Sequence, residues 1–447
     1  MDSGEKRLNE LGYKQELRRE MTLFKSLAIT FSTVTMFAGI PLYGPSLLYA
    51  GPASLVWGWV VVSFFTWFVG IALAEICSSF PTTGSLYFWA AHLAGPKWGP
   101  FASWCCAWLE IIGLISGIGT MVIGCSVLVI MLPLVALSRR PVSYVFGHLE
   151  IASESTGISS KPYAVILSVL LSHFALLGYD TAGHITEETK GADKNGPIAI
   201  LSSIGIVSLF GWAYVLSFTF SIQNFEYLFD ANNETGGAYV PAQILYDAFY
   251  GRYHSSAGAI VFLVVIWGSF FFGGLSGSTG AARVVYALSR DQGLPFSHIW
   301  RRIHPKHKVP ANAVWLCATI CMLLGLPIIK VNVVFTAIIS ICTVGWVGGY
   351  GVPIFARLVM KEENFKPGPF RLGKAGKPVS LVAFLWICYT CSVFLLPTLY
   401  PIEWKTFNYA PVALAFCLSL VMLWWVLDAR KWFKGPLRNI DVVNGKP

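Results

Sequence analysis

The chain has 447 residues, of which 55% are hydrophobic and only 12% are charged, and its mean hydropathy is +0.61. Soluble globular domains carry about 25% charged residues, so this composition excludes a soluble fold and predicts an integral membrane protein. The formal net charge of +9 does not indicate a nucleic-acid-binding protein, because the basic residues are spread over several short loops and form no single patch.

Residues 1–26 are predicted to form a cytoplasmic segment that precedes the first membrane span. Five basic and five acidic residues are interspersed in its first 22 positions, a composition that fits neither a cleavable secretory signal nor a mitochondrial transit peptide. The first apolar run begins only near Leu23, and it is long enough to cross a bilayer.

The first predicted span, 27–49, contains an interruption. Two glycines and two prolines lie within positions 37–45, and this combination cannot form an unbroken helix. Secondary transporters bind substrates near the midplane where spans are broken, because freed backbone N–H and C=O groups hold polar substrate groups there. Gly39, Ile40 and Pro41 are therefore candidate substrate-binding residues, and the alternative is a kink that binds nothing.

The second predicted span, 54–76, is regular, but the next apolar run, 101–137, is too long for one crossing. It holds 37 residues with Glu110 as its only charge, whereas a span needs about 20 residues. A continuous helix of that length would reach about 55 Å, nearly twice the ~30 Å hydrocarbon core. The run is therefore predicted to cross once in an irregular way, or twice. Glu110 is a candidate for proton relay, with packing against a hydroxyl or a wet cavity as the alternative.

The fourth predicted span, 163–182, is also broken. Gly178 precedes Tyr179 and Asp180 at the end of its apolar run, and ionisable groups inside spans are costly and usually functional. We therefore expect Gly178, Tyr179 and Asp180 to bind substrate together with Phe174. The alternative is that Asp180 only marks the membrane surface.

Two further features are candidates for ion coupling or gating. His173 lies within the fourth span and its imidazole titrates near neutral pH, but a hydrogen-bonded neutral histidine is the alternative. Ser276 and Ser278 lie in a stretch of small residues in the sixth span, 257–283. Their hydroxyls could bind a cation, or the small side chains could simply permit close helix packing.

The remaining predicted spans bring the total to ten and are 198–222, 257–283, 313–329, 332–356, 379–400 and 408–427. The transmembrane domain is thus 27–427, and residues 428–447 form a cytoplasmic tail. The sequence has no nucleotide-binding loop, zinc-hydrolase motif or serine-hydrolase elbow. We therefore expect neither an enzyme nor a bound cofactor or metal, and any transport is secondary or passive.

Basic residues are divided unequally between the loops on the two sides. With a single crossing of 101–137, 26 of the 32 lysines and arginines share one side with both termini, as expected when that side is cytoplasmic. A double crossing would place the basic stretch 301–308 outside, so one crossing is favoured. The sequon at Asn233 then faces the outer side and is a glycosylation candidate, although such sequons also occur by chance.

Three segments resemble one group of known membrane proteins. They are residues 74–89, the break at 178–180 with residues 187–190, and residues 282–295. Together they resemble the amino acid/choline transporter branch of the amino acid–polyamine–organocation superfamily, and the whole chain is most similar to the plant amino acid and GABA permeases of that branch. The resemblance implies an all-α, multi-span transporter with inverted five-helix repeats that moves amino acids by alternating access.

The resemblance also assigns roles to the two breaks and reveals a departure from the family. The breaks at 39–41 and 178–180 would hold the carboxylate and the amine of the substrate. The family has twelve spans, whereas about two helices are missing here near Thr120 and Met121, so the first repeat is incomplete. The alternatives are therefore a GABA or choline transporter, or a shortened variant that does not transport and regulates a full-length sibling.

The expected partners are a small amino acid and the lipid bilayer, with coupling to protons or sodium ions and no nucleic acid. The resemblance implies residence in the mitochondrial, Golgi or plasma membrane and leaves the oligomeric state open. A quaternary ammonium substrate could be held by an aromatic cage of Phe37, Phe174 and Tyr179.

Overall fold

The computed structural model describes residues 3–12, 17, 19–34, 39–82, 84–117, 131–306, 308–325, 332–359, 365, 367–404 and 406–436. Within these residues all regular structure is helical, and an isolated bridge pairs Met21 with Thr189. Six of the described helices are long and apolar enough to cross a membrane, and three shorter apolar helices accompany them. The prediction of an all-α membrane fold is confirmed.

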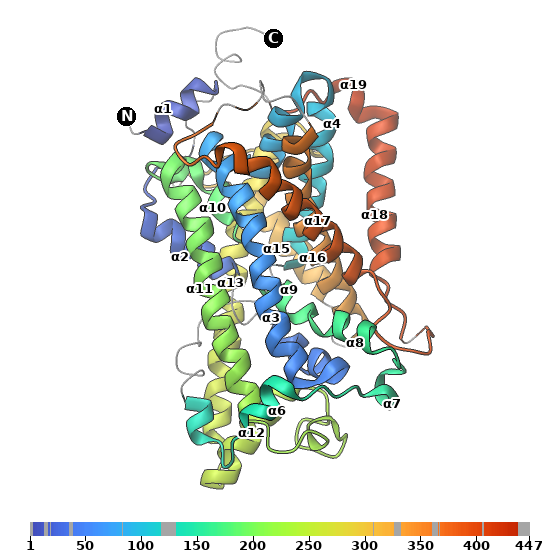
Figure 1. Cartoon of the computed structure of the whole chain (residues 1–447). Helices are drawn as coiled ribbons and strands as arrows, with labels where there is room; N and C mark the ends of the chain where they lie inside the picture. Colours follow the sequence, from blue (N-terminus) through green and yellow to red (C-terminus); the bar gives the residue numbers. More distant parts are fainter. Residues whose placement is uncertain are drawn as a thin grey trace.

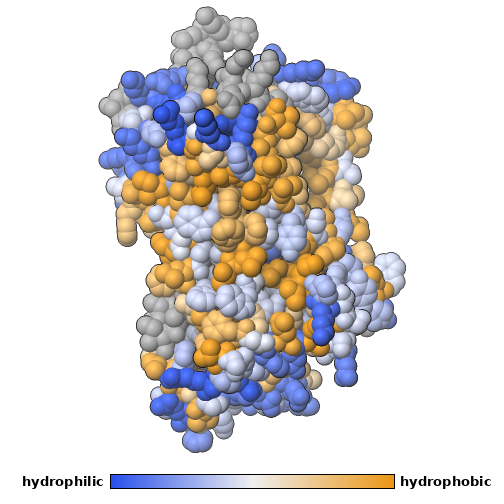
Figure 2. All heavy atoms as spheres, viewed as in Figure 1, coloured by the Kyte–Doolittle hydropathy of each residue, from blue (hydrophilic) through white to orange (hydrophobic). Residues whose placement is uncertain are grey.

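The molecule has an apolar middle and two polar ends. On the face shown in Figure 2, hydrophobic side chains form a broad band between two polar regions. At one end lie α1 (Ser3–Glu10) and α19 (Arg430–Trp432), and at the other lie α6 (Val142–Gly147) and α12 (Val240–Tyr253), as Figure 1 shows. The first and last described helices therefore share one end of the molecule.

The first predicted span is divided between α2 (Leu23–Val34) and α3 (Ile40–Ser79). α3 begins at Ile40, and residues 35–38 lie outside the described residues; Gly44 and Pro45 of the predicted interruption lie within α3. Pro41 occupies the first turn of α3, where a backbone N–H has no helical partner in any case. α3 also contains the second predicted span, because two helices join at Gly51 without a loop. Gly51 has φ +78°, and a Cβ there would lie 2.7 Å from the Glu150 nitrogen, so this corner requires glycine.

The long irregular run begins inside α4 (Ser85–Gly117), which starts well before the predicted boundary at 101. The first turns of α4 lead into a kink at Gly95, which has φ +73°. These turns contain polar residues, so the prediction of spans from apolar runs did not include them. Residues 118–130 of the run lie outside the described residues. α4 begins at the end that holds α1, and α6 lies at the opposite end (Figure 1), which agrees with one net crossing.

The fourth predicted span consists of α8 (Lys161–Ser168), α9 (Leu170–Ala175) and α10 (Thr181–His184). Residues 176–180 between α9 and α10 are not helical, so the predicted break is confirmed. The chain then returns through α11 (Ala192–Phe220), which packs against α3 and α2.

The remaining helices complete the bundle and are α7 (Ser153–Thr156), α13 (Ala257–Arg290), α14 (Ser297–Trp300), α15 (Ala311–Gly325), α16 (Asn332–Val359), α17 (Gly376–Phe394) and α18 (Ala410–Trp424). α13 continues past the predicted end at 283. Its last turns carry Arg283 and Arg290, which form ion pairs with Glu188 and Glu187. A helix end that is polar and stabilised by ion pairs cannot be predicted from hydropathy.

α4 packs along α16 because α16 presents small residues at the contact. A Cβ added to Gly349 would lie 3.7 Å from the Glu110 Cα, and one added to Gly348 would lie 3.6 Å from the Leu109 Cδ2. Cys106 donates a hydrogen bond from its Sγ to the Gly349 carbonyl at 3.4 Å. Small residues let membrane helices approach closely, and this approach fixes Glu110 beside α16.

Candidate functional site

The two helix breaks lie beside one another. A Cβ added to Gly39 would lie 2.9 Å from the Leu171 Cγ and 3.2 Å from the Ala175 Cβ, so α3 begins against α9. A Cβ added to Gly178 would lie 2.9 Å from the Thr33 Cγ2, so the second break touches the end of α2. Unpaired amides at the start of α3 and unpaired carbonyls at the end of α9 are thus gathered in one small region.

Asp180 is fully buried beside this region and accepts hydrogen bonds on both carboxylate oxygens. Its Oδ1 accepts from the Trp346 Nε1 at 2.8 Å and from the Tyr350 hydroxyl at 2.5 Å. Its Oδ2 accepts from the His184 Nε2 at 2.8 Å. The Tyr350 oxygen in turn accepts from the Gly178 N–H at 3.1 Å. Charge-assisted bonds of this kind are strong, and they tie α16 to both sides of the break.

Glu110 of α4 reaches the same cluster. Its Oε1 lies 3.1 Å from the His184 Nε2, and both side chains are fully buried. The oxygens of Glu110 make no hydrogen bond among the described residues, and His184 Nε2 lies closer to the Asp180 Oδ2, at 2.8 Å. The ligand atoms of the three groups lie within 4.8 Å of one another, and His184 Nε2 lies between the two carboxylates.

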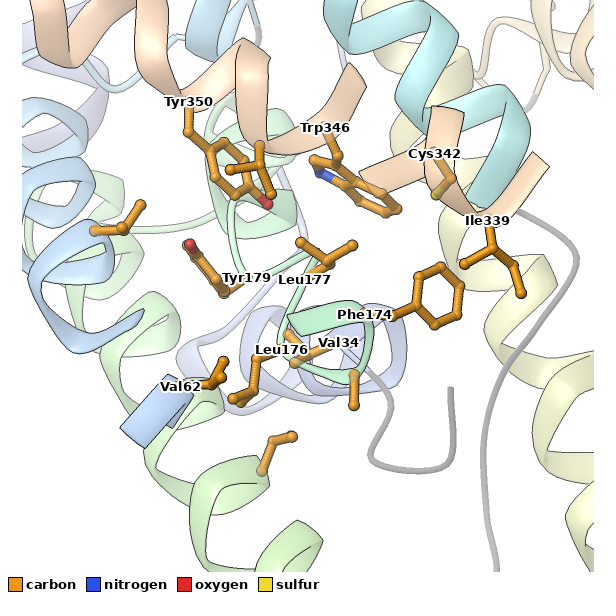
Figure 3. Close-up of a cluster of buried hydrophobic side chains, with 14 of the residues drawn as sticks. Val34, Val62, Phe174, Leu176, Leu177, Tyr179, Ile339, Cys342, Trp346 and Tyr350 are labelled. Atoms are coloured by element: carbon orange, nitrogen blue, oxygen red, sulfur yellow. The ribbon is translucent and has the colours of Figure 1, made fainter. Parts of the chain in front are cut away.

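Aromatic rings line the segment that joins α9 to α10. Figure 3 shows Trp346 and Tyr350 extending from α16 toward Phe174 and Tyr179. The Tyr179 and Tyr350 rings are 5.1 Å apart, and Phe174 is buried. Such rings attract ammonium groups. The third residue of the predicted aromatic cage, Phe37, lies outside the described residues.

A cavity of about 300 Å³ lies between α3, α9 and the segment before α12. It is lined by Pro41 and Tyr49 of α3, Leu170 of α9 and Tyr239 before α12, among others. Ile40, which precedes Pro41, is completely buried. The cavity therefore reaches the first turn of α3, next to the break.

The structure separates the other coupling candidates from Asp180. His173 stacks on Trp386 of α17, with ring centroids 5.2 Å apart. Ser276 donates to a carbonyl of α2 and lies 2.9 Å from the Thr33 Oγ1, so it supports the end of α2. Ser278 donates to a carbonyl four residues earlier in its own helix.

Asn233 lies in the loop before α12 and is only 6% exposed. Its Nδ2, the atom that a glycan would occupy, donates to the carbonyls of Tyr227 and Leu228 at 2.8 and 3.2 Å. Glycosylation at this position would therefore have to precede closure of the loop.

Sequence reasoning missed three residues of the cluster, His184, Trp346 and Tyr350. Each was detectable from helical spacing, since side chains four residues apart share a helix face. His184 follows Asp180 by four residues, and Trp346 precedes Tyr350 by four within an apolar span.

Comparison with known proteins identifies the family. A family model described as amino acid permease matches residues 117–418, and a second model with the same description matches residues 26–146. The chain belongs to the amino acid permease family. This permease is 39% identical to an amino-acid permease BAT1 homolog of Oryza sativa subsp. japonica and 38% identical to the amino-acid permease BAT1 of Arabidopsis thaliana. The alignments cover 98% of this chain and 96% and 97% of those relatives.

The expected superfamily is therefore confirmed, and the permease is a multi-pass membrane transporter that moves amino acids and is not an enzyme. An uncharacterized amino-acid permease of Schizosaccharomyces pombe is also similar, at 28% identity over 98% of this chain. Each match to a plant relative extends over 505 residues, whereas this chain has 447. The plant relatives thus carry at least 58 residues that have no counterpart here.

Proposed function

We propose that this permease binds its amino acid substrate where the two helix breaks meet. The substrate carboxylate would accept hydrogen bonds from the backbone amides of Gly39 and Ile40, at the positive end of α3, where Pro41 has no N–H to donate. The ammonium group would lie at the negative end of α9, between the carbonyls near the break at 178–180 and the carboxylate of Asp180. The observation that carries this proposal is the contact of Gly39 with α9 and of Gly178 with α2.

Asp180 would also gate the path. In the conformation described, Trp346 and Tyr350 occupy the oxygen that a substrate ammonium would approach. Binding the ammonium there therefore requires one of these donors to leave, and α16 would move with it. Substrate binding would in this way loosen the contact between α16 and α10, as alternating access requires.

The end that holds α1 is closed in this conformation. The guanidinium of Arg283 on α13 donates two hydrogen bonds to the carboxylate of Glu188, at 2.8 and 3.3 Å. Arg19 donates to the Glu187 carbonyl at 3.1 Å. The backbone of Met21 pairs with the segment after α10. The cavity at Pro41 would then be the open side of the cycle, and these contacts would separate when the site opens to the other side.

The direct test is uptake of labelled alanine, glutamate, lysine and GABA into proteoliposomes that contain the purified chain. We expect saturable uptake of at least one amino acid, competed by the unlabelled compound. Uptake of GABA or choline alone would favour the amine-transporter alternative, and no uptake of any compound would contradict the proposal for this chain.

Substituting Gly39 with leucine is expected to abolish uptake without preventing membrane insertion. The new side chain would collide with Leu171 and Ala175, and misplacing binding groups by about 1 Å can lower rates about 100-fold. The matched control is Gly268→Leu in α13, where a Cβ meets nothing within 4 Å. Normal uptake by the Gly39 variant, measured at equal protein level, would remove the break from the binding site.

The unequal distribution of basic residues supports an orientation with both termini on the cytoplasmic side. We infer a proton or sodium gradient as the driving force and the mitochondrial, Golgi or plasma membrane as the location. Protease protection of an N-terminal tag in sealed vesicles would test the orientation.

One observation favours a second function, which is regulation of a full-length permease by a chain that does not itself transport. The plant relatives carry at least 58 residues that have no counterpart in this chain, and two membrane helices need about 40 residues. Inserting the helices of a relative within residues 118–130 should then create uptake that the chain lacks. Equal uptake with and without the insertion would exclude this function.

A further inference from the structure

Glu110 is a buried carboxylate that receives no hydrogen bond. Its side chain is 0% exposed, and neither oxygen has a donor among the described residues. His184 is the nearest basic group, but its Nε2 lies closer to Asp180. An ionised carboxylate without donors is strongly unfavourable inside a membrane protein. Glu110 is therefore neutral in this conformation, with a proton on one of its oxygens.

The surroundings of Glu110 offer no permanent positive charge. Among the described residues, His184 is the only basic side chain within ion-pair distance of Glu110 or Asp180. The guanidinium of Arg283, on the neighbouring α13, is bonded to Glu188. α13 presents Gly280 to His184 itself.

The other titratable groups that face the cluster are a thiol and two phenols, which are ordinarily uncharged at pH 7. They belong to Cys106, one turn from Glu110 on α4, and to Tyr179 and Tyr350. None of these groups can neutralise an ionised Glu110. A proton on its own carboxylate removes that charge without a counter-ion.

Asp180 and Glu110 differ in a way that assigns their roles. Asp180 has three hydrogen-bond partners, whereas Glu110 has none among the described residues. His184 is a positioning residue, because its Nε2 lies 2.8 Å from Asp180 and 3.1 Å from Glu110 and so holds the two carboxylates beside each other. We therefore expect Glu110 to be the residue that gains or loses a proton when water enters or leaves the substrate site.

We propose that Glu110 carries the coupling proton of this permease: it is protonated when the site closes around the substrate, and the empty site returns without that proton. This inference rests on the proposed function. A proton from water on the open side binds a carboxylate oxygen of Glu110, and the site closes around the neutral side chain. Opening to the other side hydrates Glu110, which returns the proton to water there. No other bond forms or breaks.

Substituting Glu110 with glutamine tests the proposal, because the amide has the same shape and cannot titrate. In proteoliposomes loaded with a pH-sensitive dye, the wild-type chain should admit protons when amino acid is added, and its uptake should fall as pH rises. Glu110→Gln should admit no protons and exchange amino acids at a rate independent of pH. Glu110→Asp should restore proton entry.

The matched control is Glu75→Gln. Glu75 is also buried in a span, but unlike Glu110 it has a hydrogen-bond donor, because its Oε1 accepts from the Leu372 N–H at 2.8 Å. This variant should keep the proton entry and the pH dependence of the wild type. Proton entry in Glu110→Gln, or uptake driven by sodium at constant pH, would overturn the proposal.

An infrared measurement decides the same point without transport. The purified wild-type chain should show the C=O stretch of a protonated carboxyl group that exchanges with deuterium, and Glu110→Gln should lack that band. Glu75→Gln should retain it. An unchanged band in Glu110→Gln would refute the inference even if the permease transports. A missing uptake activity with the expected band would instead count against the proposed function alone.

Discussion

Replacing Asp180 with alanine is expected to leave little folded protein in the membrane. The change removes the acceptor of three buried donors, which belong to Trp346, Tyr350 and His184. Each donor left without a partner costs roughly 1–3 kcal/mol, and the total stability of a typical domain is only about 5–15 kcal/mol. Fluorescence-detected size-exclusion chromatography and a thermal melt of the detergent-solubilised protein would measure the loss.

The isosteric variant Asp180→Asn separates the structural role of Asp180 from its charge. An asparagine oxygen still accepts from Trp346 and Tyr350, and its amide can donate to His184 once that ring takes the other tautomer. We expect a folded protein in which the substrate ammonium loses a charge-assisted bond of roughly 1.5–3 kcal/mol, which corresponds to a rise in KM of about 10- to 150-fold. A wild-type KM in this variant would remove Asp180 from the ammonium site.

The interruptions of the first and fourth spans were predictable because their causes are local. Proline lacks an amide hydrogen and glycine lacks a side chain; both residues occur at 39–41, and glycine occurs at 178. The structure places a helix end at each position. Backbone chemistry alone was enough to predict where the chain departs from a helix.

The cluster around Asp180 was not predictable in the same way, because its members meet only through packing. Glu110 and Asp180 stood out as single charges in apolar runs, but their approach depends on how α4 lies against α16. That register follows from Gly348, Gly349 and the Cys106 contact. The local sequence does not show which of the many small residues in the spans form the contact between α4 and α16.

The direction of a side chain on a fully buried helix is equally hard to predict. All six residues of α9 are buried, so no polar face shows which side meets the substrate region. Phe174 faces α16, as Figure 3 shows, while the adjacent His173 stacks on Trp386. The sequence proposed both as site residues, and the packing of α9 between α3, α16 and α17 separates them.

Substituting Gly178 is expected to eliminate uptake even when the new side chain is only a methyl group. Gly178 has φ +86°, a conformation that costs an alanine roughly 1–2 kcal/mol. The added Cβ would also lie 2.9 Å from the Thr33 Cγ2 and 3.2 Å from the Thr33 carbonyl oxygen. The two breaks would be forced apart, and the Gly178 N–H would lose its bond to Tyr350.

The control for backbone strain alone is Gly236→Ala. Gly236 has a similar φ of +64°, but a Cβ there meets nothing within 4 Å. We therefore expect this variant to keep most of its uptake with a slightly lower melting temperature, while Gly178→Ala falls to background at a comparable protein level. If both variants lost uptake equally, strain would explain the result. If Gly178→Ala transported normally, the contact between the two breaks would not be needed for transport, and the substrate site would have to be sought elsewhere in the bundle.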